Sequence, residues 1–443
     1  MKWLKTMAVA MVCLIVFTSC SGGGNISEQN LKLPEGAVAI DLSDEGINVD
    51  GKKISSDAEA AVYAANDIVY YEEGKDFTYG EGTEKDSHSK AEADANTVVH
   101  ITEPGTYGIS GKLSKGQIAV DLGEDADENP EAVVTLILNG VDITCDVAPA
   151  VIFYNVYECG SDDTENASKE VDTAAAGANV IIADDTENFV NGAYVARIYE
   201  PGTVQLNEDK TAVEDADKLH KYDAAFYSKM SMNVNGGEKG NGVLNIDAEN
   251  EGLDSELHLT VNGGNINIES GNDGINTNED GVSVTTINDG QLTIRVTGET
   301  GEGDGIDSNG WLVVNGGKVV AEACSTSGDA GVDSDKGIHI NGGTVVATGN
   351  MMDKIESGGQ NYVIFNLPER QKGGTDLTVK DKEGNAVLNI APKNDFSILL
   401  FSQSDLADSG YTLWKGEEKL ADQGSGNMGG PGGPGGFGRP MKP

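Results

Sequence analysis

The sequence predicts an all-β fold: a parallel β-helix, that is, a solenoid with 26–27 residues per coil, closed by a small C-terminal β cap. Three observations predict it. An asparagine-glycine turn recurs at a regular interval, apolar and polar residues alternate on both sides of that turn, and glycine contributes 59 of the 443 residues. Alternation with a period of two is typical of half-buried strands, and frequent glycine is typical of tight turns.

The recurring turn is Asn-Gly-Gly or one near relative of it. It begins at Asn235, Asn262, Asn288, Asn315 and Asn341. The spacings are 27, 26, 27 and 26 residues, and only Asn288-Asp289-Gly290 lacks two consecutive glycines. A register that holds over four intervals indicates a structural repeat. Glycine supplies the positive φ that such a bend requires.

Three short strands are expected in each repeat. Two of them flank the turn, as Leu259 and Val261 do before it and Ile266 does after it. The third precedes them and has one apolar residue facing inward beside an outward acidic or amide residue. Its copies are Gly252-Leu253-Asp254-Ser255, Gly274-Ile275-Asn276-Thr277, Gly305-Ile306-Asp307-Ser308 and Gly331-Val332-Asp333-Ser334. The repeat leaves no room for a helix and is too short for a propeller blade of about 40 residues, so we expect stacked β-helix coils.

The N-terminus has the layout of an export signal. Residues 1–19 combine a basic start with a short apolar run from Met7 to Phe17, which is typical of a signal peptide. Cys20 follows small residues as in a bacterial lipobox, so residues 20–36 are expected to be a lipidated cysteine and a flexible tether. This interpretation predicts an exported protein at the cell membrane or cell surface that touches the membrane only through its lipid. Secretion without a lipid is the alternative.

The remaining chain divides by composition. We expect the β-helix over residues 37–365, the β cap over 366–420 and a disordered Gly/Pro-rich tail over 421–443. Segments 81–95 and 161–178 are interpreted as loops inserted into coils. Cys145, Cys159 and Cys324 are expected to be free, buried thiols, with a Cys145–Cys159 disulfide as the alternative.

The net charge restricts the class of partner. With 73 Asp and Glu against 30 Lys and Arg, the formal net charge is −43. Such a chain repels the phosphates of nucleic acids, so no nucleic-acid partner is expected. Neutral ligands, basic partners and divalent cations remain compatible with the charge.

Several motifs, in their order, resemble a bacterial family of carbohydrate-binding β-helix proteins over about residues 37–415. They are Gly105-Thr106-Tyr107, Leu138-Asn139-Gly140-Val141-Asp142-Ile143, the motif Asp-Gly-Ile-Asp-Ser with its variants in the other repeats, and the repeated Asn-Gly-Gly. The resemblance implies a right-handed β-helix similar in shape to pectate lyases, and binding of plant cell-wall polysaccharide with calcium. This chain has acidic or amide residues where the family often has lysine after Asp-Gly-Ile. Anionic polymers should therefore bind less readily unless a cation bridges the two.

The acidic positions of the repeat are candidate metal ligands. The candidates are Asp254, Asn276, Asp307, Asp333, Asp304 and Asp273. Equivalent positions of stacked coils lie about 4.8 Å apart, so the first four are expected to form an outward ladder in which neighbouring carboxylates repel by about 0.9 kcal/mol in water. Calcium takes six to eight oxygen ligands and is the expected bridging ion. The alternative is that Asp and Asn only favour turns and keep the surface soluble.

Three aromatic residues are candidate carbohydrate contacts, because sugars have apolar faces that pack on aromatic rings. Trp311 stands beside the inward Leu312 and should point outward, although packing under a loop is the alternative. Tyr222 and Tyr227 lie just before the most regular repeats.

Signals for catalysis are weak. The adjacent pairs Asp162-Asp163 and Asp184-Asp185 lack the flanking elements of pectin-cleaving sites, and Arg295 is the lone arginine of the regular repeats. The sequence therefore predicts a non-catalytic envelope lipoprotein that binds polysaccharide, with calcium between coils. The alternatives are a pectin-active lyase or hydrolase on the same fold and a structural or adhesive surface protein.

Overall fold

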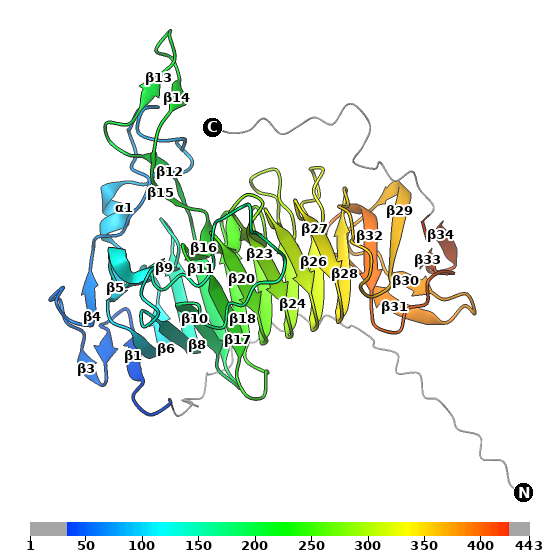
Figure 1. The fold of residues 1–443 in the computed structure, drawn as a ribbon, viewed down its shortest axis with the longest axis horizontal. Coiled ribbons are helices and arrows are strands. Elements are labelled where there is room, and N and C mark those ends of the chain that lie inside the picture. The colour runs from blue at the N-terminus through cyan, green and yellow to red at the C-terminus, as the bar shows by residue number, and fades with distance from the viewer. Residues whose placement is uncertain (1–32, 425–443) are drawn as a thin grey trace, which may run out of the picture.

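A computed structural model describes residues 33–424, and these residues form almost only β-strands (Figure 1). Within this range there are 34 strands, one α-helix, α1 (Lys90–Asp94), and one 3-10 helix, η1 (Glu124–Ala126). The all-β prediction is confirmed. None of the helices between residues 33 and 424 has the length and apolar character needed to cross a membrane.

Most strands lie in three columns, to which the regular repeats add strands; beyond β22 (Ile275–Thr277) the first column continues, within residues 33–424, only as an isolated bridge between Ile275 and Ile306. The first column is a seven-stranded sheet. Its order is β22 (Ile275–Thr277), β19 (Glu251–Ser255), β16 (Ala224–Ser228), β9 (Val151–Asn155), β7 (Gly116–Asp121), β5 (Thr97–Ile101) and β4 (Val62–Ala65). Neighbours are parallel from β22 to β5, and β4 is antiparallel to β5.

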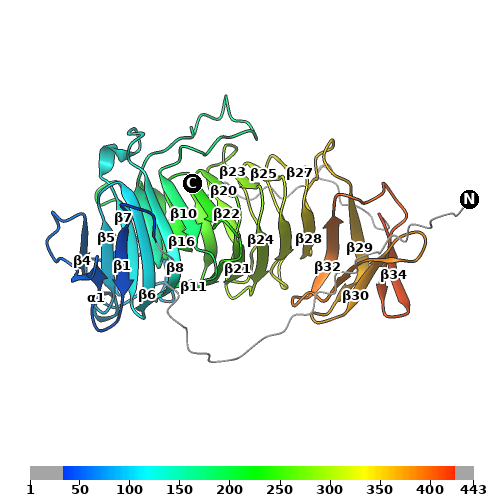
Figure 2. The same ribbon diagram turned by 90° about the horizontal axis from the view of Figure 1, so that it is seen from below.

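The second and third columns belong to one large sheet. The second column is β8 (Val134–Cys145), β10 (Ala178–Ile182), β17 (Met232–Gly236), β20 (His258–Val261), β23 (Val284–Ile287), β25 (Trp311–Val314) and β27 (Gly337–Ile340). The third also starts from β8 and continues through β11 (Glu187–Gly192), β18 (Val243–Ala248), β21 (Asn265–Ser270), β24 (Gln291–Val296), β26 (Lys318–Glu322) and β28 (Thr344–Gly349). All of these pairs are parallel, and Figures 1 and 2 show the strands as successive ribs along the long axis.

The repeated asparagines stand in one row between the second and third columns. Each side-chain amide donates to the Oδ1 atom of the preceding asparagine. The Nδ2–Oδ1 distances are 3.0 Å for Asn262 to Asn235, 2.8 Å for Asn288 to Asn262, 2.9 Å for Asn315 to Asn288 and 2.9 Å for Asn341 to Asn315. The predicted single row is confirmed, and the amide chain explains why asparagine recurs there.

The exception at Asn288-Asp289-Gly290 has a backbone explanation. The last glycine has a positive φ in four of the five turns, which is +93° at Gly264, +99° at Gly290, +71° at Gly317 and +78° at Gly343. The residue before it does not, so Asp289 can replace a glycine while Gly290 is kept.

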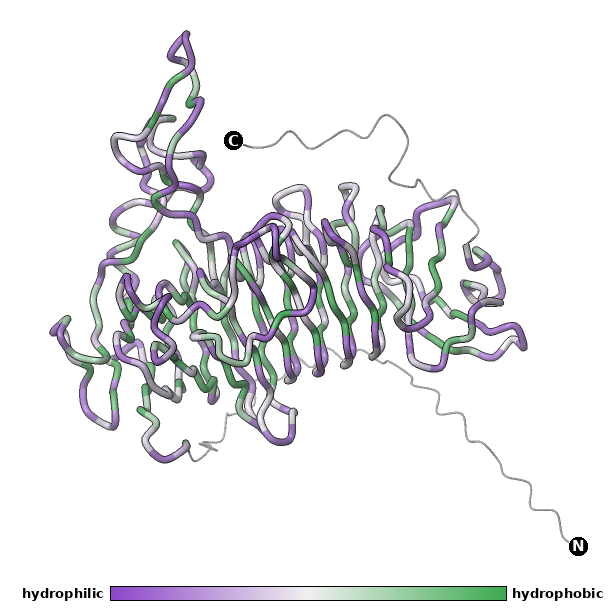
Figure 3. The backbone as a smooth tube through the Cα atoms, viewed as in Figure 1, coloured by the Kyte–Doolittle hydropathy of each residue, from purple (hydrophilic) through white to green (hydrophobic). Residues whose placement is uncertain are grey.

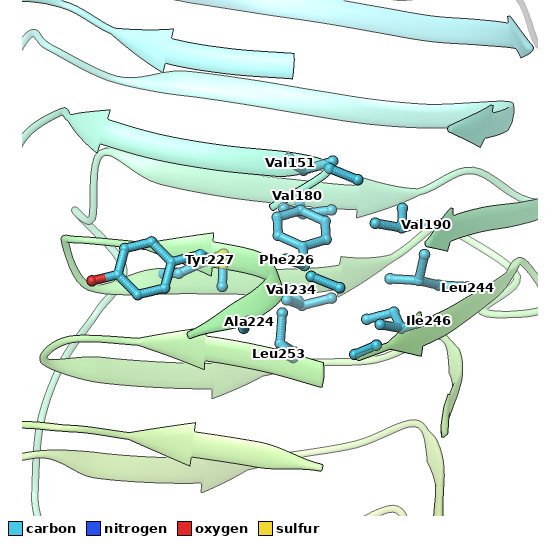
Figure 4. Close-up of a cluster of buried hydrophobic side chains, with 14 of the residues drawn as sticks. Val151, Val180, Val190, Ala224, Phe226, Tyr227, Val234, Leu244, Ile246 and Leu253 are labelled. Atoms are coloured by element: carbon cyan, nitrogen blue, oxygen red, sulfur yellow. The ribbon is translucent and has the colours of Figure 1, made fainter. Parts of the chain in front are cut away.

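The interior is filled by the apolar residues that alternate along the strands. Leu259, Val261 and Ile266 are buried, and Figure 4 shows residues such as Val234, Leu244 and Leu253 from the three columns facing a common interior. Hydropathy follows the same pattern, with apolar strands and hydrophilic turns (Figure 3).

Antiparallel strands close both ends of the stack. At the N-terminal end, β6 (Gly105–Leu113) pairs with β1 (Val38–Leu42) in parallel, and the antiparallel strands β2 (Asn48–Val49) and β3 (Lys52–Lys53) follow. At the other end, β28 pairs with β32 (Phe396–Ser402), and β32 pairs with β29 (Tyr362–Gln371). A four-stranded sheet follows, made of β31 (Ala386–Ile390), β30 (Leu377–Lys380), β33 (Thr412–Lys415) and β34 (Glu418–Asp422). Strand β29 runs across residues 365 and 366, where we expected the cap to begin.

Two segments interrupt the columns. Residues 161–177 form the loop that the sequence predicts. Segment 81–95 is not only a loop, because Ser89 and Glu92 form a capping box that starts α1. An arm made of β12 (Val195–Tyr199), β13 (Gln205–Leu206), β14 (Val213–Asp215) and β15 (Lys218–Tyr222) projects from the stack in Figure 1. The sequence analysis did not foresee this arm.

The cysteines agree in part with expectation. Cys145, Cys159 and Cys324 are free thiols; Cys145 and Cys324 are buried, whereas Cys159 is half-buried. Cys20 and residues 425–443 of the tail lie outside the described residues, whereas Ala421 and Asp422, which we expected in a disordered tail, belong to the strand β34.

Candidate functional site

Carboxylates gather along the outer side of the first column because of a local backbone arrangement. Leu253 is fully buried in the core, and a Cβ atom on Gly252 would lie 2.3 Å from the core atom Ile268 Cγ2. Two consecutive positions therefore face the interior, and only glycine fits the first of them. The residues on either side, Glu251 and Asp254, are left to face outward together. Asp304 and Asp307 flank Gly305 and Ile306 in the same way.

Asp223, Glu251 and Asp254 form the first cluster, which we call the N-terminal triad. Their carboxylate oxygens lie within 4.8 Å of one another. All three side chains are buried, and Asp254 is 0% exposed. Lys221 forms an ion pair with Asp223. The Asn278 amide donates to both oxygens of Asp254, at 2.9 and 3.0 Å.

Asp304, Asp307 and Asp333 form the second cluster, the C-terminal triad, with oxygens again within 4.8 Å of one another. Asp304 Oδ1 accepts a hydrogen bond of 2.6 Å from the backbone N–H of Ala330. The Asp304 N–H donates in turn to Asp273 Oδ1 at 2.6 Å. Since Asp307 and Asp333 come from neighbouring repeats, this triad joins two layers of the stack.

Burial and mutual repulsion raise the pKa values of these groups. Desolvation comes first, and neighbouring carboxylates add to it, so the pKa values of Glu251, Asp254 and Asp273 lie well above their ordinary values. The same causes raise the pKa of Asp304 to about 10 and that of Asp333 to about 8. At neutral pH such groups take up protons or require a cation.

In the acidic row, three buried oxygens have no hydrogen-bond partner within the described residues: Glu251 Oε2, Asn276 Oδ1 and Asp333 Oδ1. An unpaired buried polar atom is costly. Two oxygens that bind one ion at about 2.4 Å each can be at most about 4.8 Å apart, which agrees with the separations in both triads. The all-oxygen donor set therefore fits a hard divalent cation.

The structure brings most of the predicted metal ligands together but buries them. Asp254 lies opposite Asn276 in register. The row continues through backbone hydrogen bonds, because the Asp307 N–H donates to the Ile275 carbonyl and the Asp333 N–H donates to the Ile306 carbonyl. The row faces outward from the core, as expected, but Asp254 is not exposed to solvent, because neighbouring side chains such as that of Asn278 cover it.

Sequence reasoning missed Lys221 and Asp223. A signal was present, since Asp223 directly precedes the strand Ala224–Ser228, whose first residue lies opposite Glu251. Extending the repeat register by one residue upstream would have placed Asp223 beside the acidic row.

The candidate aromatic contacts differ in exposure. Tyr222 and Tyr227 are only 5% and 1% exposed, and their rings pack edge to face at 5.3 Å. Figure 4 shows Tyr227 pointing away from the interior that Phe226 fills, and its hydroxyl donates to Glu256. Neither ring offers an open face to a sugar, contrary to the expectation. Trp311 is half-buried beside the buried Leu312, which agrees with an outward side chain.

Comparison with known proteins identifies the family. Residues 95–193 and 167–398 match a family model described as carbohydrate-binding domain-containing protein, and together they span more than half of the chain. The chain belongs to this family. The family resemblance drawn from the motifs is confirmed.

A carbohydrate-binding domain-containing protein of Acetivibrio thermocellus is 28% identical over 173 residues, which are 39% of this chain and 45% of that protein. The chain thus matches less than half of this relative's length. A solved structure described as the polysaccharide lyase-like protein from C. thermocellum, gadolinium derivative, is 19% identical. That comparison covers 69% of this chain and 89% of the other, with a TM-score of 0.39, which supports no conclusion about this chain.

Both triads lie inside the region that matches the carbohydrate-binding domain-containing family. The segment before residue 95, including the loop that contacts the arm, lies outside it. The acidic row therefore belongs to the part of the chain shared with the family.

Proposed function

We propose that this protein binds polysaccharide without cleaving it, and that calcium bridges acidic residues of neighbouring repeats. The observation that carries the proposal is the pair of carboxylate triads, whose side chains are buried or half-buried and which each include one unpartnered oxygen, in a member of a carbohydrate-binding domain-containing family. In this proposal the three strand columns are the sides of a right-handed parallel β-helix, and the C-terminal sheet is its cap.

Calcium would be held mainly by the C-terminal triad. Asp304, Asp307 and Asp333 supply oxygens from two repeats, and Asp273 contributes negative charge to the same place. The ion would supply positive charge that lets these carboxylates stay ionised when buried. In the N-terminal triad, Lys221 already neutralises one carboxylate. A sugar hydroxyl or carboxylate could complete the coordination sphere at the surface.

The setting is the cell envelope. The expected lipid on Cys20 would hold the protein at the membrane or cell surface after export, with polysaccharide as its partner. The strongly negative charge disfavours nucleic acid.

Glycan binding is tested on an array of plant cell-wall and bacterial polysaccharides, with calcium and with EDTA. We expect retention of at least one polysaccharide in calcium and weaker retention in EDTA. No retained glycan under either condition would refute binding and favour a structural or adhesive protein.

The cation is tested by thermal melting. Calcium should raise the melting temperature of the unmodified protein, and the variants Asp307→Ala and Asp333→Ala should lose most of that increase. Asp289→Ala, an exposed acidic change in a turn, is the matched control. Equal melting curves with and without calcium would refute the bridging ion.

A lyase is the second candidate, because Lys221 lies beside the N-terminal triad where a base could act on a uronate. Its protonation argues against that role. Burial alone would lower the pKa of Lys221, but the charge and hydrogen bond of Asp223 outweigh it, and the pKa is raised. A base must be unprotonated to act. Incubation with polygalacturonate, followed by absorbance of unsaturated product, decides between the two.

A further inference from the structure

A second concave site lies between the arm and the loop before α1. Gly80 forms an antiparallel bridge to Ile198, and the Tyr199 N–H donates to the Tyr79 carbonyl at 2.9 Å. This register sets Tyr79 directly opposite Tyr199. Side chains that lie opposite each other in antiparallel strands share one face, with Cβ atoms about 5 Å apart, so the two tyrosines stand side by side.

The two rings line a hollow of about 510 Å³. The other lining residues are Gly74, Lys75, Asp76, Thr78, Pro201, Gly202 and Val204. This volume lies within the range of small-ligand sites, about 300–1,000 Å³. Both rings are half-buried rather than enclosed. The hollow is therefore accessible, aromatic on one side and polar at its edges.

The surroundings hold the rings in place. Tyr71 packs edge to face on Tyr79 with ring centroids 5.0 Å apart, and Lys75 Nζ lies 5.0 Å from the Tyr79 ring centre. The Arg197 guanidinium lies 5.7 Å from the ring centre of Tyr199. Rings that are already ordered lose little conformational entropy when a ligand binds.

The lining favours an uncharged ligand. Lys75 and Asp76 contribute one charge of each sign, and Asp76 already accepts hydrogen bonds from the hydroxyl and N–H of Thr78. A net charge of −43 repels anionic polymers. Sugar rings combine an apolar face with a rim of hydroxyls, and both match paired tyrosines edged by polar groups.

We propose that this hollow is a calcium-independent binding site for a neutral saccharide, whose pyranose rings pack on Tyr79 and Tyr199. The inference rests on the proposed function, since it assumes a glycan ligand, but it places binding away from the acidic triads. Lys75 to Tyr79 precede the family-matched residues, so this half of the site lies outside the region that matches the family.

The test is isothermal titration of the purified full chain with cellohexaose, xylohexaose and mannohexaose in EDTA. At least one hexasaccharide should bind. Tyr79→Ala should weaken its binding by about tenfold or more, because one stacked ring is lost. Val204→Trp fills the hollow while keeping both tyrosines, so it should also weaken hexasaccharide binding. It tests the site independently if Tyr79→Ala fails to fold. Tyr199→Phe keeps the ring and should bind nearly normally.

Phe77→Ala is the matched control, because Phe77 is 48% exposed on the same loop but does not line the hollow. It should bind as the unmodified protein does. Absence of hexasaccharide binding in EDTA, or binding that neither Tyr79→Ala nor Val204→Trp weakens, would overturn the site.

The saccharide site beside the arm and the proposed function can be refuted independently of each other. Suppose that glycan binding requires calcium, is absent in EDTA and is lost in Asp307→Ala. That result would refute the saccharide site beside the arm and would leave the proposed function intact. Binding in EDTA that depends on Tyr79 and ignores Asp307 would support the arm site and contradict a role of calcium in glycan binding.

Discussion

At the residue scale, the main tension lies in the acidic row. Asp254, Asp273 and Asp304 are buried side chains that would each be ionised in water. Their raised pKa values express the cost of that burial, which only protons, lysine or a metal can offset. In the N-terminal triad, Lys221 provides a positive charge through its ion pair with Asp223. In the C-terminal triad, the charges that raise the pKa of Asp304 further, beyond its burial, are those of other carboxylates.

This arrangement predicts a pH dependence for the metal-free protein. Asp333 and Asp304 have folded pKa values of about 8 and about 10, above their ordinary value of 3.8. Their stabilising contribution is complete below about pH 4 and is lost as the pH rises through those folded values. In EDTA, the melting temperature should fall by about 5 °C or more from pH 5 to pH 8.

The comparison with Asp304→Asn/Asp333→Asn isolates these two groups from the other acids, because burial raises the pKa of some of them, such as Asp254, and hydrogen bonds lower the pKa of others, such as Asp185. The double variant should show a shallower decline with pH. The melting temperature could instead rise equally with pH in the unmodified protein and in the double variant. That result would contradict the statement that these two carboxylates are buried without a counter-ion.

The asparagine row supports a second residue-scale prediction. Asn288 both donates to Asn262 and accepts from Asn315, whereas Asn341 only donates within the row. With about 0.5–1.5 kcal/mol per hydrogen bond, Asn288→Ala should cost about 1–3 kcal/mol and Asn341→Ala about half as much. Chemical denaturation measures both. Equal losses would indicate that the amide chain itself contributes nothing.

At the element scale, the regular repeats and the inserted loop at 161–177 were predictable, and the arm was not. The Asn-Gly turn and two-residue alternation determine strands and register through local geometry, so Leu259 and Ile266 are buried as expected. The arm depends on pairing between Gly80 and Ile198, which are far apart in sequence and carry no repeat signal. Burial of Asp254 depends on covering groups from other segments, and alternation alone cannot reveal them.

One buried carboxylate strengthens the joint between the stack and the C-terminal strands, beside the pairing of β28 with β32. Glu322 Oε2 accepts from the backbone N–H groups of Lys393 and Asn394, each at 2.8 Å. Glu322→Ala would leave two donors unpaired at about 1–3 kcal/mol each. We expect faster hydrogen exchange and proteolysis near residues 392–396, whereas Glu369→Ala, an exposed change on β29, should have no effect. Unchanged protection in Glu322→Ala would contradict this joint.

At the scale of the whole molecule, charge opposes the compact state. A net charge of −43 repels itself across the stack, and dissolved salt screens that repulsion between exposed groups. The triads are different, because buried charges are screened much less than exposed ones. Stabilisation by screening of exposed charges and stabilisation by an ion bound at the triads should therefore be distinguishable by experiment.

The melting temperature in about 1 mM calcium chloride should exceed that in sodium chloride of equal ionic strength by several degrees, because an ion that binds only the folded state stabilises it by about 2.7 kcal/mol at a hundred times its Kd. Magnesium should be less effective, since it demands near-ideal octahedral geometry and dehydrates reluctantly. In Asp307→Ala/Asp333→Ala the calcium and sodium curves should converge, while the response to high sodium chloride should persist, because that response comes from the exposed acids. If sodium chloride at equal ionic strength stabilised the unmodified protein as much as calcium does, the effect would be screening alone, and the buried carboxylates would be held by protons.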